Sequence, residues 1–120
     1  MDDGKAIILQ PGDGERVNAT LSFKATGTDG LGHFSLIEEV LPVGDGGPPL
    51  HIHNTHDEAF YVVAGELTMR AGAETITAPT GTFVFVPSGT VHGFANRSSA
   101  PVTFIFIHAP GGYETIFHEI

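Results

Sequence analysis

Short apolar stretches alternate with polar positions and turn residues along most of the chain, in the manner typical of β-strands. The clearest stretches are residues 83–86 and 102–108, which are rich in phenylalanine, valine and isoleucine. Clusters of glycine and proline, such as residues 44–49, separate the stretches. The pattern predicts about nine or ten short strands. The predicted strands include residues 20–24, 34–41, 50–53, 59–63, 67–71, 74–78, 83–86, 91–95 and 102–108.

Two segments are less regular than the others. Residues 34–41 mix apolar and acidic positions and could form a short helix by composition, but their place between two glycine-rich loops favours a strand. We expect Glu38 and Glu39 to form a solvated edge that discourages aggregation. Residues 113–120 follow Gly111 and Gly112 as a tail, in which Ile116 and Phe117 are expected to pack against the rest of the molecule.

Composition supports an all-β fold in one domain that covers residues 1–120. The chain is 41% hydrophobic and contains 16 Gly, 8 Pro and 9 Phe, which suits many short strands joined by tight turns. We find no internal repeat, no low-complexity segment and no linker long enough to divide the chain. A sandwich or a barrel is therefore expected.

Charge and cysteine content exclude several classes of function. The formal net charge is -9 with only five Lys and Arg residues, so no basic patch is expected that could bind nucleic acid or an anionic membrane surface. Cysteine is absent, which excludes disulfides, thiolate catalysis and zinc-finger sites. The start of the chain lacks the pattern of a signal peptide, and no apolar run reaches the length of a membrane helix. We therefore expect a cytoplasmic protein.

Three histidines and one glutamate form the strongest chemical signal in the sequence. His51 and His53 point to the same side if their segment is a strand, and Glu58 follows after a short turn. His92 lies much later, but neighbouring strands of a barrel can bring it close to the other three. These side chains make a first shell for a divalent transition metal such as Fe, Mn, Ni, Co, Cu or Zn. Four protein ligands around an octahedral ion leave two positions for small molecules.

Two spacings in the sequence are similar to the signatures of the cupin family. The first runs from residue 51 to 65, with His51, His53, Glu58 and Gly65 in place. The second runs from residue 81 to 96, with Gly81, Pro87, Gly89, His92 and Asn96 in place. One position departs from the pattern, because Asp45 stands where the family has glycine. A loop one residue longer or shorter would leave the ligands untouched.

The resemblance implies a jelly-roll fold, the double-stranded β-helix of cupin barrels, often paired as a homodimer. The local sequence of residues 48–62 looks most like that of the small quercetinase-like cupins. This resemblance implies a metal-dependent dioxygenase that acts on an aromatic or enol-containing small molecule. Glu58 would then serve both as metal ligand and as catalytic base. Two alternatives remain open: a non-redox isomerase or cyclase of natural-product metabolism, and a module that binds a metal or small ligand without turnover.

Strand alternation also indicates which side chains face the predicted site. Phe94 shares a face with His92, and Phe60 and Val62 share a face with Glu58. An apolar substrate pocket is therefore predicted from five residues: Phe34, Phe60, Val62, Met69 and Phe94. Some of the four phenylalanines in residues 83–85 and 104–106 are expected to add to its wall.

The remaining residues of interest receive simpler interpretations. Gly89 is expected to adopt a positive φ in the turn that directs His92 inward. His56 lies in the turn between the ligands, and a solvated position is favoured over one that supports the metal site. His33, His108 and His118 are expected to be surface or packing residues.

Overall fold

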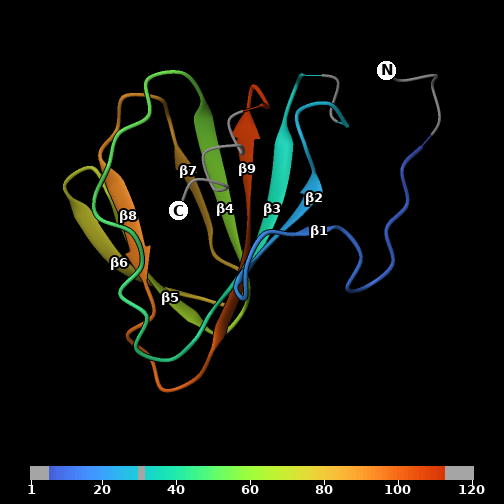
Figure 1. Cartoon of the computed structure of the whole chain (residues 1–120). Coiled ribbons are helices and arrows are strands. Elements are labelled where there is room, and N and C mark those ends of the chain that lie inside the picture. Colours follow the sequence, from blue (N-terminus) through green and yellow to red (C-terminus); the bar gives the residue numbers. More distant parts are fainter. Residues whose placement is uncertain (1–5, 30–31, 113–120) are drawn as a thin grey trace.

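The computed structural model describes residues 6–29 and 32–112, which form two antiparallel β-sheets (Figure 1). These ranges contain no helix, and so none with the length and apolar character needed to cross a membrane. The strands are β1 (Glu15–Arg16), β2 (Leu21–Ala25), β3 (Ser35–Leu41), β4 (Asp57–Ala64), β5 (Glu66–Ala71), β6 (Glu74–Pro79), β7 (Phe83–Val86), β8 (His92–Ala95) and β9 (Val102–Ala109). The predicted tail at residues 113–120, with His118, lies outside the described residues.

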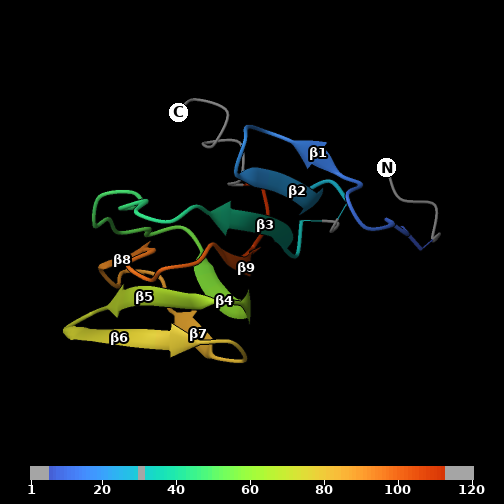
Figure 2. The same ribbon diagram turned by 90° about the horizontal axis from the view of Figure 1, so that it is seen from below.

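The two sheets build the walls of a jelly roll. The larger sheet has the order β1-β2-β3-β9-β4-β7, and the smaller has the order β6-β5-β8. Seen from below, the smaller sheet lies opposite β3 and β9 (Figure 2). Non-consecutive neighbours such as β3 and β9 show that the chain crosses between sheets instead of forming simple hairpins. The predicted all-β fold is confirmed.

Alternating burial explains why these segments form strands. In β9 every second side chain from Val102 to His108 is buried, and β3 shows the same alternation from Ser35 to Leu41. The inner faces meet in a core whose largest members include Phe60, Phe104 and Phe106, each at most 2% exposed. Burying one such ring contributes about 1.5–3 kcal/mol. The core thereby fixes which strand positions face the barrel interior.

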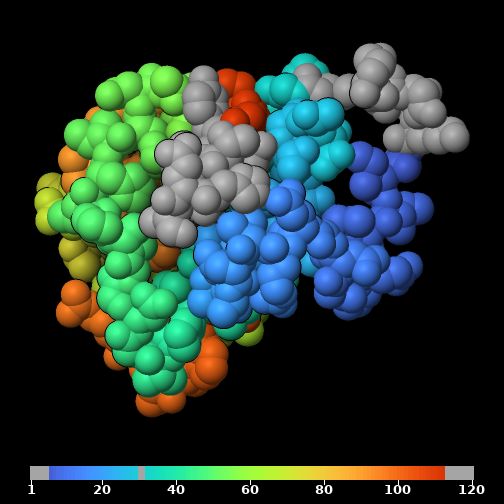
Figure 3. Space-filling view, viewed as in Figure 1, coloured from blue at the N-terminus to red at the C-terminus, as the bar shows by residue number. Residues whose placement is uncertain are grey.

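The prediction of a strand at residues 50–53 is wrong. The segment makes one isolated bridge, between His51 and His92, and is otherwise irregular. Pro48 and Pro49 precede it and cannot donate ladder hydrogen bonds. The long connection from residue 42 to 56 instead passes along β8 and forms one side of the molecular surface, coloured teal to green in Figure 3.

The prediction that Glu38 and Glu39 form a solvated edge is wrong for Glu39. β3 lies between β2 and β9, so it is not an edge strand, and alternation turns Glu39 inward. Glu39 is 8% exposed and pairs across the sheet with Leu21 and Phe104. Burial, with a smaller contribution from the charge of Asp45, raises the pKa of Glu39 to about 7.

This buried carboxyl should make stability depend on pH. The folded chain binds the Glu39 proton more tightly than the unfolded chain, whose pKa is near 4.5, so stability is lost as pH rises from about 4.5 to about 7. Urea denaturation in EDTA measures the unfolding free energy at pH 5 and at pH 8. We expect the decrease between these two pH values to be larger in the wild type than in Glu39→Gln, by up to about 3 kcal/mol. Glu38→Gln, on the same strand, should behave as the wild type. A parallel pH dependence of the wild type and Glu39→Gln would contradict this assignment.

Candidate metal centre

Glu58 is the carboxylate around which the site is built. It is the second residue of β4, where alternation turns its side chain into the barrel, and it is 4% exposed. β4 lies between β7 and β9, and Glu58 pairs across them with Val86 and His108. Direct partners in neighbouring strands have Cβ atoms about 4.5–5.5 Å apart. The register therefore places one histidine beside Glu58 before any loop contributes.

His92 enters the barrel at the first position of β8. The turn before it contains Gly89 with φ 87°, which confirms the predicted positive φ, and the Gly89 amide donates to the carbonyl of His53 at 2.7 Å. The Ser88 amide donates to Asp57 at 2.8 Å and ties the turn to β4. The His92 ring donates from Nδ1 to the carbonyl of Thr90 at 2.9 Å, which leaves Nε2 to face the site.

The long loop before β4 supplies the other two histidines. His51 exchanges both backbone hydrogen bonds with His92, each at 3.0 Å, so the loop is fastened to β8 at the ligand itself. Its Nδ1 donates to the carbonyl of Pro49 at 2.8 Å. His53 lies two residues further on, and its side chain is 18% exposed. The half-buried His51 and His53 form the more open side of the cluster, whereas Glu58 and His92 form its buried side.

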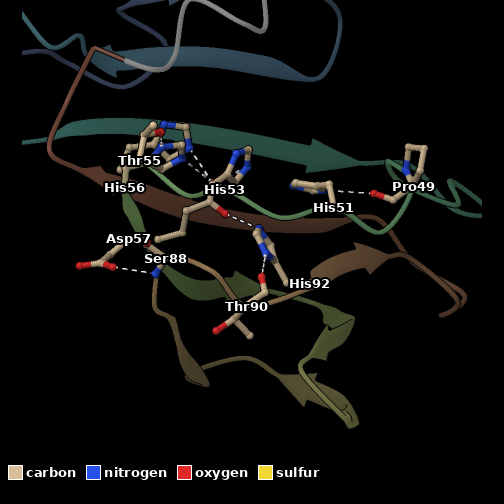
Figure 4. A network of polar contacts seen from close by, with 11 residues as sticks. Pro49, His51, His53, Thr55, His56, Asp57, Ser88, Thr90 and His92 are labelled. Atoms are coloured by element: carbon tan, nitrogen blue, oxygen red, sulfur yellow. Dashed lines mark hydrogen bonds and ion pairs between the residues drawn. The ribbon is translucent and has the colours of Figure 1, made fainter.

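The four side chains meet as the sequence predicts. One donor atom from each of His51, His53, Glu58 and His92 lies within 4.8 Å of all the others (Figure 4). His92 Nε2 lies 2.6 Å from Glu58 Oε1, and His53 Nε2 lies 3.6 Å from Glu58 Oε2. Three imidazoles and a carboxylate form a donor set that suits a divalent transition metal.

Electrostatics keeps Glu58 and His53, but not His92, in the protonation state that binds a metal ion. Burial would raise the pKa of Glu58, but hydrogen bonds from His108 and His92 outweigh it and hold that pKa below its usual range. Burial lowers the pKa of His53 to about 4, so its ring is neutral near pH 7. Burial opposes charge on His92, yet its hydrogen bonds to Glu58 and Thr90 raise its pKa overall. A metal ion must therefore displace a proton from His92.

Comparison with known proteins agrees with this geometry. A sequence model of the Cupin domain matches residues 37–108, which is more than half of the chain. The chain belongs to the cupin family. It is 27% identical over 122 residues to quercetin 2,3-dioxygenase of Bacillus subtilis, and the match covers 99% of this chain but 36% of that enzyme. The chain thus spans about a third of the length of this relative.

Solved structures confirm the cupin fold. A cupin protein from Bacteroides fragilis superposes with a TM-score of 0.70 at 17% identity, covering 93% of this chain and 88% of that one. A predicted oxalate decarboxylase from Thermotoga maritima gives 0.71 at 18% identity, covering 75% of this chain and 78% of that one. At such low identity the likeness concerns the fold alone.

Two further histidines, His56 and His108, lie beside Glu58, although the sequence analysis predicted other positions for them. His56 is 4% exposed, so its expected solvated position is wrong, and its Nε2 lies 3.7 Å from Glu58 Oε2. His108 was expected on the surface or in packing; it is fully buried, and its Nε2 lies 2.7 Å from the same oxygen. Alternation along β9 after Phe104 and Phe106 is a signal that could have indicated the inward position of His108. His33 is exposed, as one of its two expected roles requires.

The residues predicted to line a substrate pocket occupy different environments. Phe60, Val62 and Met69 are at most 2% exposed and belong to the core cluster, while Phe94 is half-buried against it. Phe34 precedes β3 and is 38% exposed. Among the additional phenylalanines, the two of β9 face the core and the two of β7 face outward. A role in substrate binding stays a prediction for all five named residues.

The loop that carries His51 depends on close backbone contact at Gly47. Gly47 has φ 68°, and a methyl group there would collide with the carbonyl oxygen of Phe94 in β8. Gly44, in the same loop, has φ 83° but no heavy atom within 4 Å of such a methyl group. Both glycines adopt a positive φ, which disfavours alanine. Only at Gly47 would a side chain also collide with neighbouring backbone atoms.

This contrast predicts different results for two alanine variants. Gly44→Ala should lower the unfolding free energy by about 1 kcal/mol, the cost of a positive φ for alanine. Gly47→Ala should cost more than about 2 kcal/mol and should also weaken metal binding, because the displaced loop carries His51. Urea denaturation and metal titration measure the two effects. Equal behaviour of the two variants would show that the loop adapts without cost.

Proposed function

We propose that this cupin is a metal-dependent enzyme that acts on a small aromatic or enol-containing molecule, most simply as a dioxygenase. The observation that carries the proposal is the convergence of His51, His53, Glu58 and His92 on one point. The similarity to quercetin 2,3-dioxygenase supports the reaction class. When bound, the metal ion would act as a Lewis acid for the substrate oxygen and bring it into reach of dioxygen.

The side chains of the site support this chemistry in separate ways. His92 and His108 hold Glu58 ionised, so its carboxylate carries no proton and can accept a hydrogen bond from an enol or phenol hydroxyl, for which it would serve as base. The half-buried His51 and His53 mark the side from which a small molecule approaches. Phe60 closes the inner side, with its ring centroid 6.3 Å from that of His92.

A homodimer is part of the proposal. Tyr61 and Phe83 are direct partners on the outer side of β4 and β7, and Phe85 lies two residues further along. These three side chains are 44%, 62% and 54% exposed, and together they present an apolar surface that a second copy of the chain can cover. Analytical ultracentrifugation would measure the assembly.

Oxygen consumption tests the proposed reaction. The purified protein is loaded in turn with Fe, Mn, Ni, Co, Cu or Zn and offered a panel of flavonols, catechols and enols. We expect metal-dependent oxygen uptake with at least one class of substrate, and its loss in Glu58→Gln but not in His33→Gln, whose residue is exposed outside the site. A protein that binds metal at the four-residue group but consumes no oxygen across the panel would overturn the dioxygenase assignment and favour non-redox chemistry.

A further inference from the structure

A second group of potential metal ligands lies beside the first and shares one member with it. His56, Glu58 and His108 each offer a donor atom, and these atoms lie within 4.8 Å of one another. All three side chains are at most 4% exposed, so this group lies on the buried side of the cluster. The rings of His56 and His108 have centroids 4.4 Å apart, and the ring of His53 lies 4.4 Å from that of His56.

The second group has nitrogen–oxygen distances to Glu58 similar to those of the first. In the first, His92 Nε2 lies 2.6 Å from Glu58 Oε1 and His53 Nε2 lies 3.6 Å from Glu58 Oε2, so the two contacts go to different oxygens. In the second, the corresponding distances are 2.7 Å (His108) and 3.7 Å (His56). Separations of 3.6–3.7 Å are too long for a hydrogen bond. They suit two donors that each lie about 2.1 Å from one ion.

We propose that His56, Glu58 and His108 hold a second divalent transition metal ion and that the Glu58 carboxylate bridges the two ions. This inference rests on the proposed function, because it takes His51, His53, Glu58 and His92 as the first site. Two histidines and one carboxylate are a recurrent ligand set for such ions. Paired ions in proteins lie about 3.5–4 Å apart, a distance that one carboxylate can span.

The orientation of Glu58 favours bridging over binding to one ion alone. Its Oε1 lies against His92, whereas its Oε2 lies against His108. Oε1 therefore faces His92 of the first group, whereas Oε2 faces His108 and His56 of the second group and lies 3.6 Å from His53 of the first. His56 Nδ1 lies 3.0 Å from the hydroxyl of Thr55, which orients the ring so that Nε2 is directed toward Glu58.

Charge makes the second position the weaker of the two. Both groups depend on the single negative charge of Glu58, so an ion already bound by four donors repels an ion bound by three. We therefore expect a tight site that fills first and a weaker site that fills at higher metal concentration. If His108 and His56 served only to position Glu58, their loss would weaken the tight site and leave the stoichiometry at one.

The test is a count of bound ions. Equilibrium dialysis against Zn²⁺, followed by elemental analysis, is applied to the wild type, His56→Gln, His108→Gln, His51→Ala and the control His33→Gln. We expect about two ions per chain in the wild type and in His33→Gln, and about one in each of the other three. In His56→Gln and His108→Gln the tight site should keep its affinity to within about tenfold. His108 is fully buried, and His108→Gln could therefore fail to fold. In that case the number of ions bound by His56→Gln tests the second site.

Other results would overturn the inference. One ion per chain in the wild type, with weakened binding in His56→Gln, would assign both histidines to positioning Glu58 and leave the first site intact. A second ion that persists in both His56→Gln and His108→Gln would place it elsewhere on the chain. Absence of the tight site from the wild type, with no effect of His51→Ala, would instead refute the proposed function. Mn²⁺ electron paramagnetic resonance offers an independent readout, because two bridged ions give the hyperfine pattern of a coupled pair.

Discussion

Replacing Glu58 with glutamine is expected to weaken the binding of divalent metal ions by more than about 100-fold. The loss of a residue that merely supports a ligand typically costs about 10–100-fold, so the loss of the ligand itself should cost more. Glutamine preserves the size of the side chain but removes its charge, and its amide group places a donor where His92 and His108 also present nitrogens. The four-residue group would retain its three imidazoles and lose its only carboxylate.

Thermal unfolding with and without metal measures this effect. An ion at about 100 times its dissociation constant stabilises the folded wild type by about 2.7 kcal/mol, equivalent to a rise in Tm of roughly 10 °C. Glu58→Gln should show almost no rise, whereas Glu38→Gln on β3 should match the wild type. Each variant is compared with itself in EDTA, so changes in the stability of the metal-free protein cancel. An undiminished rise in Glu58→Gln would show that the ion binds away from this cluster.

The sequence was sufficient to predict the parts of the site that depend on local spacing. His51, His53 and Glu58 lie within eight residues of one another, and the turn around Gly89 that precedes His92 has a composition that defines its shape. The strand positions followed from alternation in the same way. Where a proline pair interrupted the pattern, at residues 48–49, the predicted strand was replaced by a single bridge.

The errors concern positions that depend on long-range register. Whether Glu39 faces water or the core depends on β3 lying between β2 and β9, an order that no local pattern specifies. Likewise, His108 lies beside Glu58 because β4 pairs with β9 in one particular register, 50 residues along the chain. A shift of that register by one residue would turn His108 to the opposite face. Local alternation could indicate that His108 faces inward, but only the pairing of β4 with β9 shows that it meets Glu58.

Replacing Phe60 with alanine is expected to lower the unfolding free energy by about 3–5 kcal/mol. Phe60 is 2% exposed, and its ring stacks on Phe106 at 5.4 Å and lies 6.3 Å from Phe104. Removing the ring leaves a cavity in a core that the surrounding strands cannot collapse to fill, because the sheet hydrogen bonds hold them apart. Such a loss is a large part of the about 5–15 kcal/mol that stabilises a typical domain. Urea denaturation in EDTA measures it without a contribution from metal.

Two control variants separate a role in the core from a role in substrate binding. Phe60→Leu keeps most of the volume and should cost less than about 1.5 kcal/mol, while Phe85→Ala removes a ring that is 54% exposed and should change stability by no more than about 0.5 kcal/mol. If Phe60 serves mainly the core, Phe60→Leu should leave the KM for the substrate unchanged. A large rise in KM with little loss of stability would instead place Phe60 in the wall of the substrate pocket, where the alternation of β4 first placed it. That outcome would assign the Phe60 ring its main role beside His92, at a centroid distance of 6.3 Å, instead of in the stack with Phe106.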